Sequence, residues 1–99
     1  LKKLILDNQK KKLFLVTNGN ILRQKNKIYY LGIKKYFKKI YILDGKTKKL
    51  KPSVKSVVYL TRQIKKWGNK NSVYIGDNLN VDKNFAKNLK VFFIHFKFN

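Results

Sequence analysis

The sequence contains no cysteine, no methionine and no glutamate, and it has a single proline. Without cysteine there is neither a disulfide framework nor thiolate chemistry. No apolar run approaches the roughly 20 residues that a membrane-spanning helix needs. Residues 1–7 do not resemble a signal peptide, because the apolar stretch is short and no small-residue cleavage site follows it. These absences together favour a cytoplasmic protein without a membrane segment.

Positively charged residues are the most prominent feature of the composition. Twenty-five Lys and Arg residues against four Asp give a net charge of +21, and only Arg23 and Arg62 among the cations are arginine. A charge of this size attracts polyanions, so nucleic acid is a candidate partner for non-specific binding. The abundance of Lys and Asn together is also typical of compositional drift, so the charge has two possible causes.

The chain of 99 residues is long enough for one small domain, predicted over residues 1–99. A chain of this size buries about 60–65% of the surface that its unfolded form exposes, so its core is modest. The content of 43% apolar and 14% aromatic residues excludes intrinsic disorder. Because the chain opens with Leu1, we expect it to belong to a longer or processed protein.

Short apolar runs alternate with stretches of helical spacing. The runs predict strands at residues 13–16, 40–43, 72–75 and 91–96, and the spacing predicts helices at residues 1–11, 21–31, 52–68 and 81–89. Pro52 is expected at the start of the third of these helices. Strands that are apolar on both faces and alternate with helices indicate an α/β fold with a Rossmann-like parallel sheet.

Polar residues follow the predicted strands, and ligands of parallel sheets bind at the carboxyl ends of strands. Thr17 offers a hydroxyl, and the N–H groups of Asn18 and Gly19 are expected to be free to bind a phosphate oxygen. Lys51 supplies a positive charge that neutralises phosphate. Each residue also has a purely structural alternative, since Thr17 and Asn18 suit a helix cap and Lys51 suits a solvated surface.

Two of the four acidic residues fall in one short segment. Asp77 follows a predicted strand and is a natural ligand for Mg²⁺, which prefers oxygen. Asp82 lies five residues further on, where a helix would return it towards the site. There Asp82 would bind the metal, a metal-bound water or Lys51. A plain turn role for Asp77 is the alternative.

Three segments in order carry a family resemblance: Val16–Gly19 after a strand, Lys51–Ser53 at an expected helix start, and Gly76–Asp82, which reads GDxxxxD. They resemble the second, third and fourth motifs of the haloacid dehalogenase (HAD) superfamily of phosphohydrolases, and the resemblance extends from about residue 13 to residue 94. It implies Mg²⁺-dependent hydrolysis of a small phosphomonoester through an aspartyl-phosphate. The catalytic and phosphate-binding lysine would be Lys51.

The first motif of that family, DxDx(T/V) on the first strand, is missing, since no Asp-x-Asp occurs in the chain. Asp7 lies too close to the next strand for a parallel crossover. If Asp44 were the second aspartate of the motif, the nucleophile would lie two positions earlier, where the chain has Ile42. We therefore expect the nucleophile and the general acid to lie outside these residues. The sheet should be incomplete, with a gap between the strands that end at Thr17 and Gly76.

The competing hypothesis is a basic RNA-binding or ribonucleoprotein subunit with a degenerate HAD-like fold. Residues 34–41 interleave lysines with aromatic rings, as nucleic-acid-binding segments do. The same rings also suit core positions beneath a lysine-covered surface. His95 is expected to be an ordinary strand residue, and Trp67 is expected to pack at a helix end.

Overall fold

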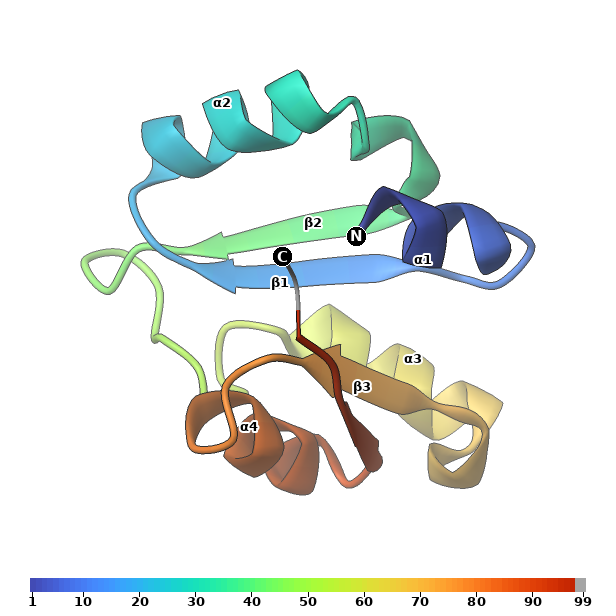
Figure 1. Cartoon of the computed structure of the whole chain (residues 1–99). Coiled ribbons are helices and arrows are strands. Elements are labelled where there is room, and N and C mark those ends of the chain that lie inside the picture. The colour runs from blue at the N-terminus through green and yellow to red at the C-terminus, as the bar shows by residue number, and fades with distance from the viewer. Residues whose placement is uncertain (98–99) are drawn as a thin grey trace. The chain divides into compact units, whose positions relative to one another are not determined.

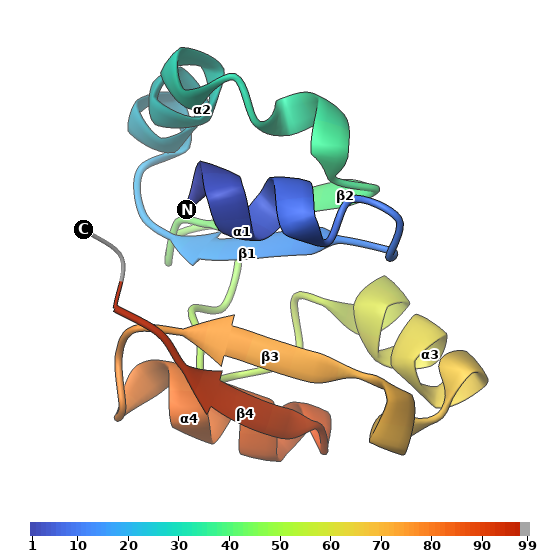
Figure 2. The same ribbon diagram turned by 45° about the vertical axis from the view of Figure 1, so that its right-hand side comes forward.

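The computed structural model describes residues 1–97 and divides into two compact units, one over residues 1–48 and one from Lys49 onward (Figures 1 and 2). Each unit contains one pair of parallel strands with helices beside it. The α/β class predicted from the sequence is confirmed. The expectation of a single domain stays a prediction.

The first unit is built on two strands that pair in parallel. Its elements in order are α1 (Lys2–Asp7), β1 (Phe14–Asn18), α2 (Ile21–Leu31), the 3₁₀ turn η1 (Lys34–Tyr36) and β2 (Lys39–Leu43). The register pairs Phe14 with Lys39 and Asn18 with Leu43. Helices α1 and α2 lie on the same side of the strand pair (Figures 1 and 2).

The core of the first unit fills the space between these helices and the strands. Ile5 of α1, Ile28 of α2 and Ile33 form its buried centre. Side chains packed against that centre come from β1, β2, η1 and the residues next to them: Leu13, Leu15, Tyr36, Phe37, Ile40 and Ile42. The period of two along each strand places the strand residues of this set on one face of the pair.

Local signals fix both ends of α2. The Asn20 side chain accepts a hydrogen bond from the Arg23 amide at 3.0 Å, which satisfies one free donor of the first turn. Gly32 ends the helix in the left-handed conformation, with φ +64°, and its N–H donates to the Tyr29 carbonyl. Glycine adopts this conformation without steric cost. The predicted range of 21–31 is confirmed.

The second unit repeats the strand–helix–strand arrangement. Its elements in order are α3 (Val58–Trp67), the 3₁₀ turn η2 (Asn69–Asn71), β3 (Val73–Gly76), α4 (Val81–Leu89) and β4 (Phe92–His95). Strands β3 and β4 are parallel, and Val73 pairs with Phe92. Among the buried side chains of this unit are Val57, Leu60, Ile64, Phe85 and Leu89.

The start of α3 differs from the sequence prediction. The prediction placed Pro52 at the helix N-terminus, whereas the helix begins at Val58. Two turns closed by backbone hydrogen bonds occupy residues 50–57, and the Pro52 carbonyl accepts a hydrogen bond from the Asn88 side chain at 2.8 Å. Val57, which is fully buried, anchors the end of this segment. Contacts with α4 therefore override the local helix-start signal of the proline.

The four strands form two separate sheets in the part of the chain that the structure describes, with β1 and β3 in different sheets. This agrees with an incomplete sheet that lacks the strand expected between them. None of the helices within residues 1–97 has the length and apolar character needed to cross a membrane.

We predict that the isolated 99-residue chain is only marginally stable. Each unit has its own small core, and cores of this size rarely supply more than about 3–5 kcal/mol. Urea unfolding followed by circular dichroism should give a free energy of unfolding at or below that range. A single steep transition with a much larger free energy would contradict the prediction.

Candidate functional site

The residues at the end of β1 form a tight turn. Thr17 and Asn18 are the last residues of the strand, and the Thr17 hydroxyl lies 3.5 Å from the Asn18 carbonyl. The Gly19 amide donates to the Leu43 carbonyl at 2.9 Å, so the expectation of a free Gly19 N–H is wrong. The phosphate-binding candidates of this turn are consequently the Thr17 hydroxyl and Asn18.

Asp44, at the end of β2, acts within its own loop. Its carboxylate accepts hydrogen bonds from the amides of Lys46, Thr47 and Lys48 and from the Thr47 hydroxyl. The bond from the Thr47 amide is the main cause that holds the pKa of Asp44 below its usual range. These contacts assign Asp44 to loop structure, in agreement with the sequence-based exclusion of a nucleophile here.

The central feature of the second unit is an ion pair between Lys51 and Asp82. The Lys51 ammonium lies 2.8 Å from Asp82 Oδ1, and the two side chains are only 11% and 7% exposed. Tyr74 completes the cluster, because its hydroxyl accepts from the Lys51 ammonium at 2.9 Å and donates to Asp82 Oδ1 at 3.3 Å. We call these three residues the Lys–Tyr–Asp cluster.

Three segments distant in sequence supply this cluster. Lys51 comes from the turns before α3, Tyr74 from β3 and Asp82 from the first turn of α4. The segment between β3 and α4 holds the carboxylate in place, since the Asn78 amide donates to Asp82 Oδ2 at 3.1 Å. The Asn78 carbonyl in turn accepts from the Asp82 amide at 2.9 Å. Both oxygens of Asp82 thus have protein partners.

Gly76 explains the first position of the GDxxxxD pattern. A Cβ placed on Gly76 would lie 2.5 Å from the Cβ, Cγ and Oδ2 atoms of Asp82. Any side chain there would push the carboxylate away from Lys51. The close approach of the Asp82 side chain to the β3 backbone therefore requires glycine at this position.

Aromatic rings enclose the Lys51 ammonium. It lies 5.5 Å from the centre of the Tyr74 ring and 5.9 Å from that of Phe85, and these two rings meet edge to face at 5.0 Å. Burial raises the pKa of the Tyr74 hydroxyl far above its usual value, with the charge and hydrogen bond of Asp82 and the charge of Asp77 adding to the effect. Tyr74 is therefore a neutral hydrogen-bond donor to Asp82 at ordinary pH.

Asp77 follows β3 directly, and its side chain is exposed. The backbone around it is fixed, because His95 Nε2 lies 3.1 Å from the Asp77 carbonyl and the Asn78 side chain accepts from the amides of Asn80 and Val81 at 2.8 Å. Within residues 1–97 no three acidic, His or Cys side chains gather into a complete metal cluster. Asp77 offers an exposed carboxylate at a strand end, which fits one position in an oxygen ligand set that water and substrate would complete.

The sequence-predicted residues fall into both units. Thr17, Asn18 and Gly19 belong to the first, whereas Lys51, Asp77 and Asp82 belong to the second. Of the three partners considered for Asp82, the structure shows Lys51. The metal roles of Asp77 and Asp82 stay predictions.

Two contacts of the site were not predicted: Tyr74 in the ion pair and His95 against the loop after β3. The sequence does carry a signal for Tyr74. It precedes Gly76 by two residues, so alternation along the strand places both on the face that Asp82 approaches. His95 lies in β4, as predicted, and Trp67 ends α3.

We predict that Tyr74 does not ionise while the chain is folded. An unfolded tyrosine loses its proton near pH 10. Because the folded pKa is raised, the stability that Tyr74 contributes is complete below that pH and is lost as the pH rises above it. An alkaline titration of tyrosinate absorbance should therefore give the same amplitude around the usual pKa for the native chain and for Tyr74→Phe. The missing tyrosine should appear only after unfolding, and a smaller native-state amplitude for Tyr74→Phe would contradict the assignment.

Comparison with known proteins identifies relatives of this chain. The sequence model of the haloacid dehalogenase-like hydrolases matches residues 1–96. Comparison with curated proteins gives no match. Among solved structures, the chain is similar to YfnB from Bacillus subtilis, described as a putative HAD-hydrolase and bound to magnesium, with a TM-score of 0.77 and 24% sequence identity.

That alignment covers 93% of this chain and 40% of the YfnB chain, so the chain spans less than half the length of its structural relative. At 24% sequence identity, this similarity shows a shared fold only. The family match covers nearly every residue and includes the three motif-like segments at Thr17, Lys51 and Gly76–Asp82. The chain belongs to the haloacid dehalogenase-like hydrolases.

Proposed function

We propose that this chain is the phosphate- and metal-binding part of a Mg²⁺-dependent phosphomonoester hydrolase. The observation that carries the proposal is the buried Lys51–Asp82 pair, which lies beside the loop that presents Asp77. A lysine held by a carboxylate and a tyrosine hydroxyl keeps its ammonium at a fixed place. Fixed positive charge is what the transfer of a phosphoryl group requires most.

Each residue has a distinct part in the proposal. Lys51 neutralises a phosphate oxygen, and Thr17 and Asn18 bind phosphate through a hydroxyl and polar groups at the end of β1. Gly19 contributes the turn itself, since its φ of +147° is a backbone conformation that residues with a Cβ rarely adopt. Tyr74 acts as a positioning residue through its bonds to Lys51 and Asp82.

Asp77 would be the direct ligand of Mg²⁺, which binds proteins through one or two carboxylates and keeps several waters. Asp82 would act on the metal through its ordering of the Asn78 loop and of Lys51, because both of its oxygens already have partners. When bound, the metal supplies charge neutralisation at the phosphate. A phosphorylated small molecule, met in the cytoplasm, is the proposed substrate.

The nucleophile is not among these residues, since no Asp-x-Asp occurs in the 99 positions. We propose that an aspartate from a further strand attacks phosphorus and forms an aspartyl-phosphate, while the bond from phosphorus to the ester oxygen breaks and a general acid, also outside these residues, protonates the departing alcohol. Water then attacks the aspartyl-phosphate, which releases inorganic phosphate and the free aspartate. The family membership and the two separate strand pairs within residues 1–97 support this arrangement.

The experiment uses the complete protein that contains this chain, with p-nitrophenyl phosphate as substrate. Asp77→Asn should lower Mg²⁺-dependent hydrolysis by about 100-fold or more, because it removes a charged ligand from the metal. Asp44→Asn is the matched control, since that carboxylate serves its own loop, and it should leave the rate within a factor of about two. Equal rates for Asp77→Asn and the native protein would remove Asp77 from the site.

A second measurement needs only the 99 residues. Titration with Mg²⁺, followed by amide NMR, should shift the resonances of residues 76–80, and Asp77→Asn should abolish the shift. Loss of this response together with loss of hydrolysis assigns the defect to metal binding. A full Mg²⁺ response in Asp77→Asn would contradict the ligand role.

A further inference from the structure

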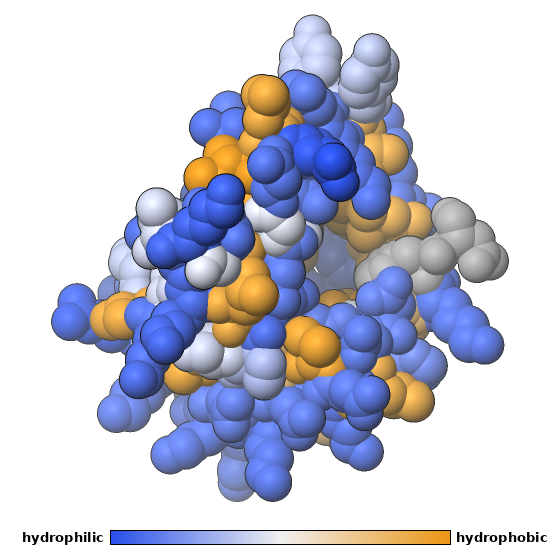
Figure 3. Space-filling view, turned by 90° about the vertical axis from the view of Figure 1, so that its left-hand side faces the viewer, coloured by the Kyte–Doolittle hydropathy of each residue, from blue (hydrophilic) through white to orange (hydrophobic). Residues whose placement is uncertain are grey.

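The surface of the first unit around α2 and η1 combines exposed aromatic rings with lysines. We call it the α2–η1 surface, and its residues are Lys25, Tyr29, Tyr30, Lys34, Lys35 and Lys38. None of them belongs to the phosphate and metal site, so a role for this surface is independent of the proposed function. Figure 3 shows how hydrophilic side chains surround apolar ones on one face of the molecule.

The two tyrosines are almost fully exposed. Tyr29 and Tyr30 retain 82% and 88% of their accessible surface, and their rings meet edge to face with centres 6.4 Å apart. The aromatic residues of the 34–41 stretch behave differently: Tyr36 and Phe37 pack against the core and Tyr41 is buried. The aromatic rings of the 34–41 stretch therefore occupy core positions, the alternative that the sequence left open. Helix α2, in contrast, presents two rings to solvent.

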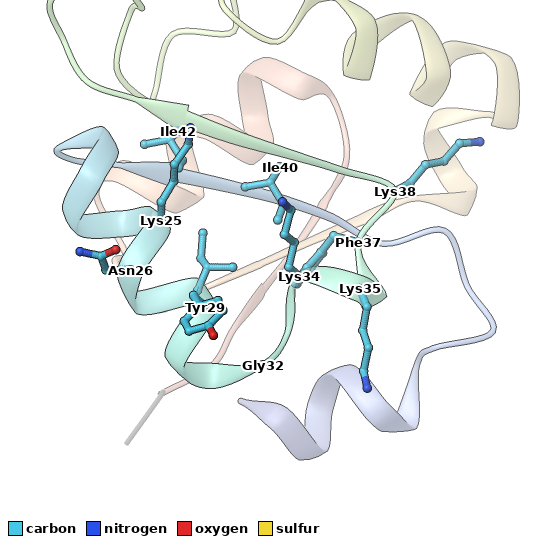
Figure 4. A pocket seen from close by; sticks show the side chains of 11 residues that line it. Lys25, Asn26, Tyr29, Gly32, Lys34, Lys35, Phe37, Lys38, Ile40 and Ile42 are labelled. Carbon is cyan, nitrogen blue, oxygen red and sulfur yellow. The ribbon is translucent and has the colours of Figure 1, made fainter.

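A hollow lies beside these rings. Its volume is about 870 Å³, and its apolar lining includes Ile28, Phe37, Ile40 and Ile42. Lys25, Lys34, Lys35, Lys38 and Tyr29 also line this hollow. In Figure 4 the side chains of Lys25 and Lys34 extend towards Ile42 and Ile40, whereas those of Lys35 and Lys38 extend outward. The hollow thus combines an apolar lining with four lysines at its edge, which we call the rim lysines.

The charge on this surface has no internal balance. Residues 21–43 include seven Lys and Arg and no Asp or Glu. Within the part of the chain that the structure describes, none of the four rim lysines forms an ion pair. Such a cluster repels itself and is stabilised by an anion with several charges at matching spacing.

We propose that the α2–η1 surface binds single-stranded nucleic acid. Unpaired bases stack on the exposed faces of Tyr29 and Tyr30, as every base offers a π-face to an aromatic side chain. The backbone phosphates contact the four rim lysines, and a base enters the apolar hollow. A duplex keeps its bases stacked on one another, so it presents phosphates but no free base faces to the tyrosines.

The test is fluorescence anisotropy of the 99-residue chain with labelled oligouridine and with its deoxy counterpart, over a range of salt concentrations. Tyr29→Ala with Tyr30→Ala should weaken binding by about tenfold or more and leave the salt dependence unchanged. Tyr29→Phe with Tyr30→Phe keeps the ring faces and should bind as the native chain does. Equal affinity of the Ala and native proteins would overturn the stacking role.

The charge contribution is tested with two variants of equal net charge. Replacing Lys25, Lys34, Lys35 and Lys38 with Gln should reduce the slope of log K against log salt by about 3, as expected for four phosphate contacts with a single strand. The control replaces four exposed lysines of the second unit, Lys65, Lys66, Lys70 and Lys83, and should change the slope by less than about 1. Equal effects of the two variants would show general attraction to a polycation and overturn the proposal.

Two further arms separate the ligand classes. A duplex of the same length should bind more weakly than the single strand, and comparison of the ribose and deoxyribose strands distinguishes RNA from DNA as the source of the phosphates. Phosphatidylserine vesicles should leave the fluorescence of Tyr29 and Tyr30 unchanged. Binding to the vesicles without binding to either oligonucleotide would overturn the proposal in favour of a membrane surface. Circular dichroism of every variant confirms that the chain remains folded.

Discussion

The buried ion pair between Lys51 and Asp82 is the constraint around which the second unit is arranged. Charges removed from water are costly unless each has a partner and the remaining polar positions are satisfied. Here the Lys51 ammonium meets a carboxylate and a hydroxyl, and the carboxylate also accepts from the Asn78 amide. The pair therefore fixes the segment before α3, the strand β3 and the start of α4 relative to one another.

Several features of this unit depend on that constraint. Gly76 is needed because the Asp82 side chain approaches the strand backbone closely. Tyr74 stays neutral because burial and the neighbouring carboxylate oppose its ionisation. The delayed start of α3 leaves residues 50–57 in turns that bring Lys51 to the carboxylate. A helix beginning at Pro52 would have been favoured locally, but the contacts of the Lys–Tyr–Asp cluster and of the Pro52 carbonyl prevail.

The acidic residues of this chain are few, and their use explains the charge distribution. Asp44 organises a loop, Asp82 pairs with Lys51, and Asp77 is exposed at the end of β3. None of these lies within residues 21–43, where the cations of the α2–η1 surface accumulate. Both proposed activities concern phosphate oxygens, yet they rest on different physics. The family site holds one ammonium rigidly in a buried cluster, whereas the α2–η1 surface presents several solvated ammonium groups beside exposed rings.

Local sequence signals were sufficient for the order and type of the elements and for their parallel pairing, because these depend on apolar period and on turn residues. The ends of α2 are the clearest case, since Asn20 and Gly32 act within one turn of the helix. The motif order at Thr17, Lys51 and Gly76–Asp82 also identified the family. Long-range packing was needed to show that the Gly19 amide binds Leu43, that Tyr74 joins the ion pair and that Tyr29 and Tyr30 are the exposed rings. The Gly19–Leu43 bond and the ion pair arise from contacts between residues far apart in sequence, such as the 31 positions that separate Lys51 from Asp82. Strand alternation places Tyr74 on the same face as Gly76, but it does not show which side chains meet there.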